Sequence, residues 1–229
     1  MDQEQLTQYS VALQFCSRIF QNSPDEDMLR GVIGGGLLQG LGGWECFGSS
    51  EQAEMLWGGA LAPERSAAAL AKAYPADVAL DSRSLYLELH MDHLALFSGP
   101  QPVAAPWESV WREKDRLLFG RSTQEVRDCY REWGIAAERD GHEPEDHLGL
   151  ELAFMLFLVQ NLSTGAASCR GESPQIALVD FMDAHIMTWA GECLKKASEC
   201  ARTVFYREMP VLCCLLLGNM RRNMAGLPV

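Results

Sequence analysis

The chain has 229 residues, 48% hydrophobic and 22% charged, so it can bury a core without needing a disulfide or a metal. Its 19 Lys and Arg residues against 31 Asp and Glu give a net charge of −12. This acidity excludes nucleic acid as the expected main partner, because like charges repel, and it attracts basic peptides, although it also simply favours solubility.

Eight cysteines are present without a CxxC pair, a pattern that favours a reducing cytosol over a disulfide framework. The first residues are polar and acidic, so no export signal is expected. The longest uninterrupted apolar run, Leu152–Val159, is far shorter than the roughly 18–20 residues that span a membrane. The sequence predicts a cytoplasmic protein with no stable membrane insertion.

Apolar residues at helical spacing predict a first helix over Leu6–Phe20, ended by the break at Asn22–Asp25. Gly31–Gly48 then holds eight glycines in 18 positions. Neither GxxxxGK[ST] nor GxGxxG after a strand occurs there, so no guanine or other nucleotide is expected. The segment is interpreted as a flexible connection or as helices in close backbone contact.

The stretch Glu51–Tyr74 reads as one helix that Pro75 ends, with an Ala-rich middle that favours helix. A further helix is expected over Arg83–Phe97, with Asp81 and Ser82 preceding it. Three prolines in Ser98–Pro106 predict a turn or an extended loop.

Ser122 is predicted to cap the next helix, with Glu125 completing a capping box and Gly134 ending it. An apolar helix is expected from Pro144, with Glu145 and Asp146 in its first turn. Three more helices are predicted, over Gln175–Thr188, over Gly191–Tyr206 and from after Pro210 to about Asn223. No segment shows the alternation of a strand, so the predicted fold is mainly α.

Two clusters of residues could carry metal or acid–base chemistry. His90 and His93 are three residues apart near Glu88 and Asp92, a spacing that suits a metal site or a satisfied surface pair. In His142–Leu152, acidic side chains crowd His147, as in an acid–base pair or in ordinary capping of a helix. HExxH and GxSxG are both absent, which disfavours catalysis.

A third cluster, in Pro106–Phe119, places Trp107 and Trp111 four residues apart beside the proline-rich loop. Amphipathic aromatic side chains next to loops are common in peptide-binding grooves, and core packing explains them equally well.

Taken in order, several of these motifs resemble the TorD/DmsD-type redox enzyme maturation chaperones. They read Leu96-Phe97-Ser98-Gly99, then Pro106-Trp107-Glu108-Ser109-Val110-Trp111, then Leu118-Phe119-Gly120, Tyr130 to Gly134, and Glu143-Pro144-Glu145-Asp146-His147. His185, Trp189 and Phe205-Tyr206 are also similar to the family's C-terminal helices. The resemblance covers about Leu85–Leu217 well and the N-terminal third loosely.

The resemblance implies an all-α, single-domain TorD-like helical bundle over 1–229, with divergent N-terminal helices in 1–80 and a core in 81–223. It implies a chaperone, not an enzyme, that binds the twin-arginine signal peptide and the apoprotein of a molybdenum-cofactor oxidoreductase before export. The client is not identified, and no cofactor or metal is expected in the chaperone itself. The implied signal-peptide site consists of His93, Leu96, Phe97, Pro106, Trp107, Ser109, Trp111, Glu143, Pro144, Asp146 and His147.

The chain departs from the family pattern at two positions. His93 stands where the family usually has an aromatic residue, and Gln101 where a tryptophan can occur. Both changes make the expected groove less apolar and leave its peptide preference open.

Two other functions remain open. A metal-dependent hydrolase would use His90, His93, Asp146 and His147, whereas a helical adaptor without a groove would bury Trp107 and Trp111 completely. The glycine-rich segment also allows either a monomer or a dimer that exchanges segments between chains.

Overall fold

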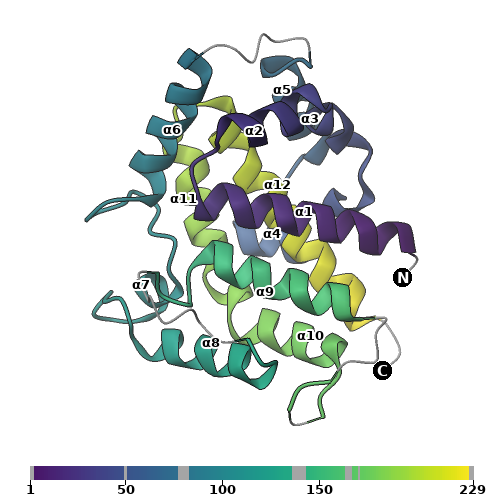
Figure 1. Cartoon of the computed structure of the whole chain (residues 1–229), viewed down its shortest axis with the longest axis vertical. Coiled ribbons are helices and arrows are strands. Elements are labelled where there is room, and N and C mark those ends of the chain that lie inside the picture. The colour runs from purple at the N-terminus through teal and green to yellow at the C-terminus, as the bar shows by residue number, and fades with distance from the viewer. Residues whose placement is uncertain are drawn as a thin grey trace.

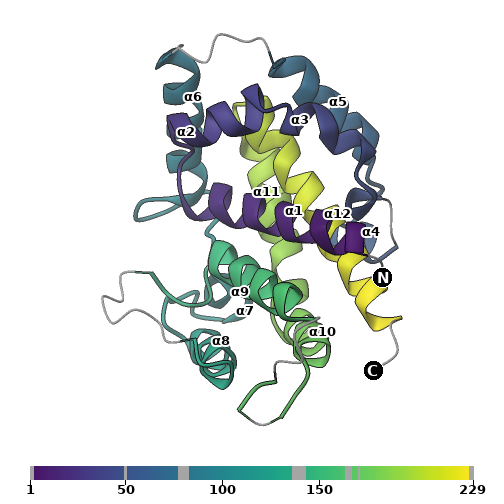
Figure 2. The ribbon, with the colours of Figure 1, turned by 45° about the vertical axis from the view of Figure 1, so that its right-hand side comes forward.

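The computed structural model describes residues 3–48, 51–76, 83–135, 143–162, 167–169 and 171–226. These residues form helices joined by loops, with no strand among them, so the predicted all-α fold is confirmed (Figures 1 and 2). None of the described helices is long and apolar enough to cross a membrane. The apolar side chains that the helices bury, from Tyr9 to Met224, pack into one core cluster.

The first helix, α1 (Gln3–Gln21), lies across α9 (Leu148–Asn161) (Figure 2). Gly149 makes this crossing possible, because a Cβ atom there would lie only 2.8 Å from the Ser17 carbonyl oxygen. The Ser17 hydroxyl donates a hydrogen bond of 2.7 Å to the Gly149 carbonyl. Two helices distant in sequence are therefore in backbone contact.

After the predicted break, Asp25 caps α2 (Glu26–Leu29) by accepting a hydrogen bond from the Met28 N–H. The glycine-rich segment that follows is a chain of short helical turns. A π-helical turn spans Arg30–Gly34, α3 spans Leu37–Gly40, and two 3₁₀ turns span Leu41–Gly43 and Glu45–Phe47. Their apolar side chains point into the core, which holds the segment in place.

The prediction of one helix over Glu51–Tyr74 was wrong. The segment forms α4 (Glu51–Trp57) and α5 (Pro63–Ala73). Gly58 ends α4 in a left-handed conformation (φ 76°), and Pro63 occupies the first turn of α5. Gly58 and Pro63 therefore divide the segment into two helices despite the high helix propensity of the alanines.

The helix α6 (Arg83–Phe97) has the predicted bounds, although Asp81 and Ser82 lie outside the described residues. A loop leads to the short helix α7 (Glu108–Arg112) and then to α8 (Arg121–Glu132). Ser122 does not cap α8, because the helix already begins at Arg121. The backbone N–H of Ser122 instead donates a hydrogen bond of 2.9 Å to the Glu113 carboxylate. Gly134 (φ 72°) follows the end of α8 as predicted.

The apolar helix α9 begins at Leu148, four residues after Pro144, so its predicted start was wrong. His147 is its N-cap, and the Nδ1 atom of that ring accepts a hydrogen bond from the Gly149 N–H at 3.0 Å. The preceding residues form a turn whose side chains bond to other elements, as described below.

Three helices complete the chain: α10 (Pro174–Ala184), α11 (Ala190–Cys200) and α12 (Val204–Ala225). A 3₁₀ turn, Ile186–Thr188, joins the first two. The predicted break at Pro210 was wrong, because Pro210 lies inside α12 and the break falls before Thr203. Thr203 and Asp92 cap the start of α12, and the helix then runs through the core. This burial outweighs the roughly 3 kcal/mol cost of an interior proline.

Candidate functional site

Two segments distant in sequence pair their backbones at one place on the surface, and together they form the candidate site, defined as Pro106–Ser109 and Glu143–Leu148. The Glu108 N–H donates to the Asp146 carbonyl at 2.9 Å, and the Leu148 N–H donates to the Pro106 carbonyl at 2.7 Å. Trp107 and His147 face each other in this antiparallel bridge. Each proline precedes the bridge and favours extended backbone in the residue before it.

Asp146 joins the two segments from inside, and its side chain is fully buried. One carboxylate oxygen accepts the Ser109 N–H at 2.8 Å, at the first turn of α7. The other oxygen accepts the Thr123 hydroxyl at 2.9 Å, in the first turn of α8. Asp146 therefore holds two helix N-termini in place, and neither of them belongs to the helix that follows it in sequence.

Trp107 and Glu143 meet at the surface of the candidate site, with the buried ring of His147 beside them. The indole N–H of Trp107, which is half-buried, donates to a carboxylate oxygen of Glu143 at 2.5 Å. The ring of Trp107 meets that of His147 edge to face, with centroids 6.0 Å apart. Partial burial raises the pKa of Glu143, whereas the hydrogen bond from Trp107 opposes this rise. The site thus presents an aromatic ring and a carboxylate together.

Behind this surface, the end of α6 contributes a buried wall. Phe97 packs against Phe20 and Tyr206, at centroid distances of 5.6 and 5.7 Å. His93 packs against Phe97 at 5.4 Å, and only 3% of it is exposed. Burial lowers the pKa of His93 to about 4 and that of His147 to about 3, so both rings are neutral at pH 7.

The two ring nitrogens of His93 make no hydrogen bond of normal geometry, although the nearby Phe20 backbone opposes the fall in its pKa. His93 is therefore a neutral ring packed against the aromatic side chains of Phe97 and Tyr206. It was expected in a surface pair, at a metal or in the signal-peptide site. It is buried, and among the described residues it belongs to no group that could hold a metal ion.

A buried polar network beneath the candidate site was missed by the sequence analysis. The carboxylate of Glu108 is fully buried between the guanidinium of Arg112 and the Nδ1 atom of His185, the latter at 3.0 Å. Glu151 lies nearby and accepts a hydrogen bond of 3.4 Å from the Trp189 indole. Burial and the negative charge of Glu108 raise the pKa of Glu151 well above its usual value. The sequence could have indicated this network through Glu151, a glutamate inside the otherwise apolar helix α9.

The structure brings the predicted site residues together, but not all at the surface. Trp107 and Trp111 are half-buried and Glu143 is exposed. Trp111 donates its indole N–H to the Ala105 carbonyl at 2.6 Å, so its polar atom is already bonded within the protein. The remaining eight are buried, namely His93, Leu96, Phe97, Pro106, Ser109, Pro144, Asp146 and His147.

The arrangement does not favour the other two functions. The His90 ring bonds to the Ser23 hydroxyl at 2.8 Å, whereas Asp92 caps α12. Within the described ranges, no three His, Cys, Asp or Glu side chains lie close enough to hold a metal ion. The adaptor alternative required complete burial of Trp107 and Trp111, yet both keep part of their surface exposed.

The described residues thus form a bundle of helices with a small aromatic and acidic site. The chain matches the family described as nitrate reductase delta subunit over residues 61–195, more than half its length. It is 30% identical over 135 residues to the probable Tat proofreading chaperone DmsD of Haemophilus influenzae, covering 58% of this chain and 61% of that protein. It is 31% identical over 156 residues to the chaperone protein TorD of a Shewanella species, and this alignment covers 66% of this chain and 69% of that protein.

The chain therefore belongs to the nitrate reductase delta subunit family, together with the TorD and DmsD chaperones, which are not enzymes. A third relative, the Tat proofreading chaperone DmsD of Salmonella typhimurium, is 31% identical over 130 residues, or 56% of this chain and 58% of its own. The alignments with both DmsD proteins thus cover about three fifths of those relatives.

Proposed function

We propose that this protein is a cytoplasmic chaperone that binds the twin-arginine signal peptide and the apoprotein of a molybdenum-cofactor oxidoreductase. It retains the client until the cofactor is inserted and then permits export. Membership of a chaperone family supports this proposal. The observation that carries it is the pairing of Trp107 with Glu143 at the surface of the candidate site.

This pair suits an arginine side chain. A guanidinium stacks on an aromatic face and at the same time donates hydrogen bonds to a carboxylate. Glu143 is exposed, and its hydrogen bond to Trp107 orients the carboxylate beside the indole ring. The protein's net charge of −12 attracts a basic peptide over a longer range.

The buried site residues act through position. Asp146 fixes the two segments that carry Trp107 and Glu143, because its carboxylate accepts hydrogen bonds from Ser109 and Thr123. We also propose that the whole chain is one domain, which is consistent with the single core shared by N-terminal and C-terminal helices.

The test uses a synthetic peptide with an arginine pair and its lysine-pair counterpart. Glu143→Gln removes the charge but keeps an oxygen that can accept the Trp107 indole N–H. We expect it to weaken binding of the arginine peptide roughly tenfold at low salt, and less at high salt, because charge–charge attraction is screened. Trp107→Ala should weaken it at least as much, as measured by isothermal titration calorimetry.

The lysine peptide supplies the matched control, because lysine can neither stack nor bind the carboxylate in bidentate fashion. The wild type should prefer arginine, and Glu143→Gln should reduce that preference. Equal binding of the arginine peptide by wild type, Trp107→Ala and Glu143→Gln would reject this site. Thermal melts of each variant separate a loss of binding from a loss of folding.

A further inference from the structure

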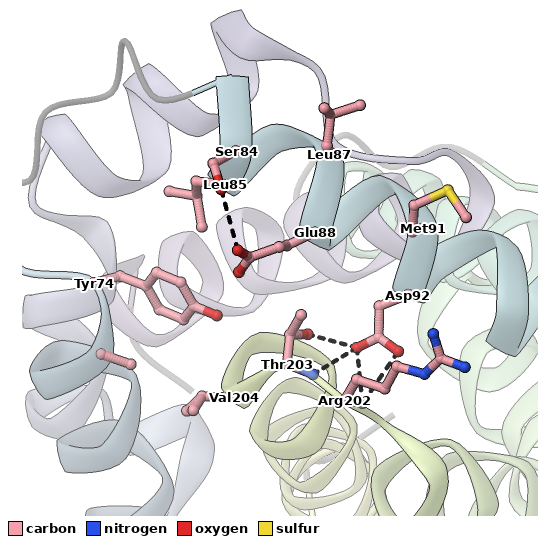
Figure 3. Close-up of a pocket in the computed structure, with 11 residues that line it drawn as sticks. Tyr74, Ser84, Leu85, Leu87, Glu88, Met91, Asp92, Arg202, Thr203 and Val204 are labelled. Carbon is pink, nitrogen blue, oxygen red and sulfur yellow. Dashed lines mark hydrogen bonds between the residues drawn. The ribbon is translucent and has the colours of Figure 1, made fainter.

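A second concave surface lies at the other end of α6, away from the candidate site. It is a cavity of about 800 Å³ between the end of α5, the first half of α6 and the start of α12, and we call it the α6 groove (Figure 3). Its lining includes Tyr74, Leu85, Glu88, Met91, Thr203 and Val204.

The groove has apolar walls, and the charged side chains of Glu88, Asp92 and Arg202 also line it. Leu85 and Glu88 point from α6 toward Tyr74 (Figure 3). The Glu88 carboxylate accepts a hydrogen bond of 3.2 Å from the neutral Ser84 hydroxyl, and no described basic side chain forms an ion pair with it. Asp92, in contrast, is occupied by the backbone N–H groups of Arg202 and Thr203. The groove therefore suits an apolar chain whose backbone N–H groups donate hydrogen bonds to Glu88.

Exposed apolar side chains continue from the groove along α6 toward the candidate site. Leu87, Met91 and Leu94 recur at helical spacing and are 44%, 56% and 39% exposed. Beyond them, Val103 is 43% exposed, and its N–H bonds to the Ala95 carbonyl at 3.4 Å. Trp107 follows four residues later. Since large apolar side chains gathered on a surface mark interaction sites, this row has the character of a binding surface.

From these observations we propose that the α6 groove binds the apolar stretch of the same peptide whose arginine pair binds Trp107 and Glu143. This inference rests on the proposed function and extends it to a second subsite. Leu87 and Leu94 are seven residues, or two turns, apart on one face of α6, about 10 Å at the rise of an α-helix. An extended peptide covers that distance in about three residues, so a short apolar segment is long enough to follow this row away from the groove.

The direction of the peptide follows from the chemistry. The basic start of a twin-arginine signal meets the aromatic and acidic candidate site, and its apolar stretch passes Leu94 and Met91 into the groove. Glu88 accepts backbone N–H groups of the extended chain. The groove and the row beside it thus select for an apolar sequence, whereas the candidate site selects for arginine.

The test uses two synthetic peptides, one with an arginine pair followed by a leucine-rich stretch and one with that stretch replaced by glycine and serine. Met91→Asp places a charge on the proposed path. Met55→Asp is the matched control, because Met55 is 67% exposed and lies on α4, outside the groove. We expect Met91→Asp to weaken binding of the leucine-rich peptide roughly tenfold and to leave the glycine–serine peptide unchanged. Leu87→Asp should act in the same way.

Trp107→Ala separates this inference from the proposed function, because it should weaken both peptides. If Trp107→Ala weakens binding while Met91→Asp and Leu87→Asp behave like Met55→Asp, the groove proposal is overturned and the proposed function stands. If Trp107→Ala changes binding of neither peptide, the candidate site fails, and with it the continuous path argued here.

Discussion

The candidate site and the α6 groove use acidic residues in opposite ways. At the candidate site, the carboxylates of Asp146 and Glu108 are buried and already bonded to other parts of the protein. In the groove, Glu88 is exposed and bonded only to a serine hydroxyl among the described residues. The comparison teaches that an acid in a family motif can serve the fold, as Asp146 and Glu108 do, or face solvent, as Glu143 does, so the motif alone does not show which acids remain available to a ligand.

The largest effect is expected at Asp146. Asp146→Ala leaves the Ser109 N–H and the Thr123 hydroxyl without their buried acceptor, which should lower the free energy of unfolding by about 3 kcal/mol. Asp146→Asn keeps one acceptor and should cost less. Urea unfolding followed by circular dichroism measures both. A cost under about 1 kcal/mol for Asp146→Ala would mean that the site is not held from inside as described.

The next largest effect concerns His93 and pH. The pKa of His93 is about 4 in the folded protein and about 6.5 in the unfolded chain. The unfolded state therefore binds its proton first, and the stability due to the neutral ring is lost as pH falls below 6.5. Between pH 7 and 5 this amounts to about 2 kcal/mol.

His93→Phe isolates that contribution. Glu151 acts in the opposite direction, because its raised pKa makes the folded state bind a proton more readily as pH falls. Both proteins contain Glu151, so its effect cancels in the difference between them. As the pH falls from 7 to 5, the free energy of unfolding of His93→Phe should rise by about 2 kcal/mol relative to that of the wild type, as measured by chemical unfolding. Parallel pH profiles would contradict a buried neutral imidazole at this position.

A smaller effect is expected at the start of α8. Glu113→Ala removes the carboxylate that accepts the Ser122 N–H, and it should cost about 1 kcal/mol. Glu125→Ala is the control, because it breaks only the exposed pair with Arg121 and should cost under about 0.5 kcal/mol. If the two variants melt at the same temperature, Glu113 is not the cap of this helix.

The smallest effect on stability belongs to the groove. Met91 is exposed, so Met91→Asp should change the free energy of unfolding by less than about 0.5 kcal/mol. A thermal melt with the Met55→Asp control checks this. Greater destabilisation than in the control would place Met91 in a structural role and remove the contrast between the two regions.

Several helix ends that depend on neighbouring residues were predicted from the sequence, whereas those that depend on distant residues were not. The bounds of α6 and the glycine after α8 depend on neighbouring residues, and the sequence predicted them. The partners of Asp146 lie 37 and 23 residues away, and the cap of α8 comes from nine residues upstream, so local patterns indicated the wrong caps. The predicted break at Pro210 was wrong for the same reason, because Asp92, on α6, caps the start of α12 at Thr203.

The residues that pair the two backbones of the candidate site lie within the family motifs. These motifs could not distinguish exposed members from buried ones. In sequence, Glu143 and Asp146 belong to the same short acidic motif, yet one faces solvent and the other is enclosed. Only the packing of α7 and α8 over the turn separates their roles.

The contact at Gly149 has a consequence for how this protein can diverge. A side chain there would collide with the Ser17 carbonyl, the backbone of Gln21 and its Cβ atom, and the Ser17 hydroxyl bonds back to the same residue. A substitution at one of these positions therefore constrains the others, even though more than a hundred residues separate them. The N-terminal helix can drift in sequence along its outer face, but at this crossing it must change in step with the segment that carries the motif.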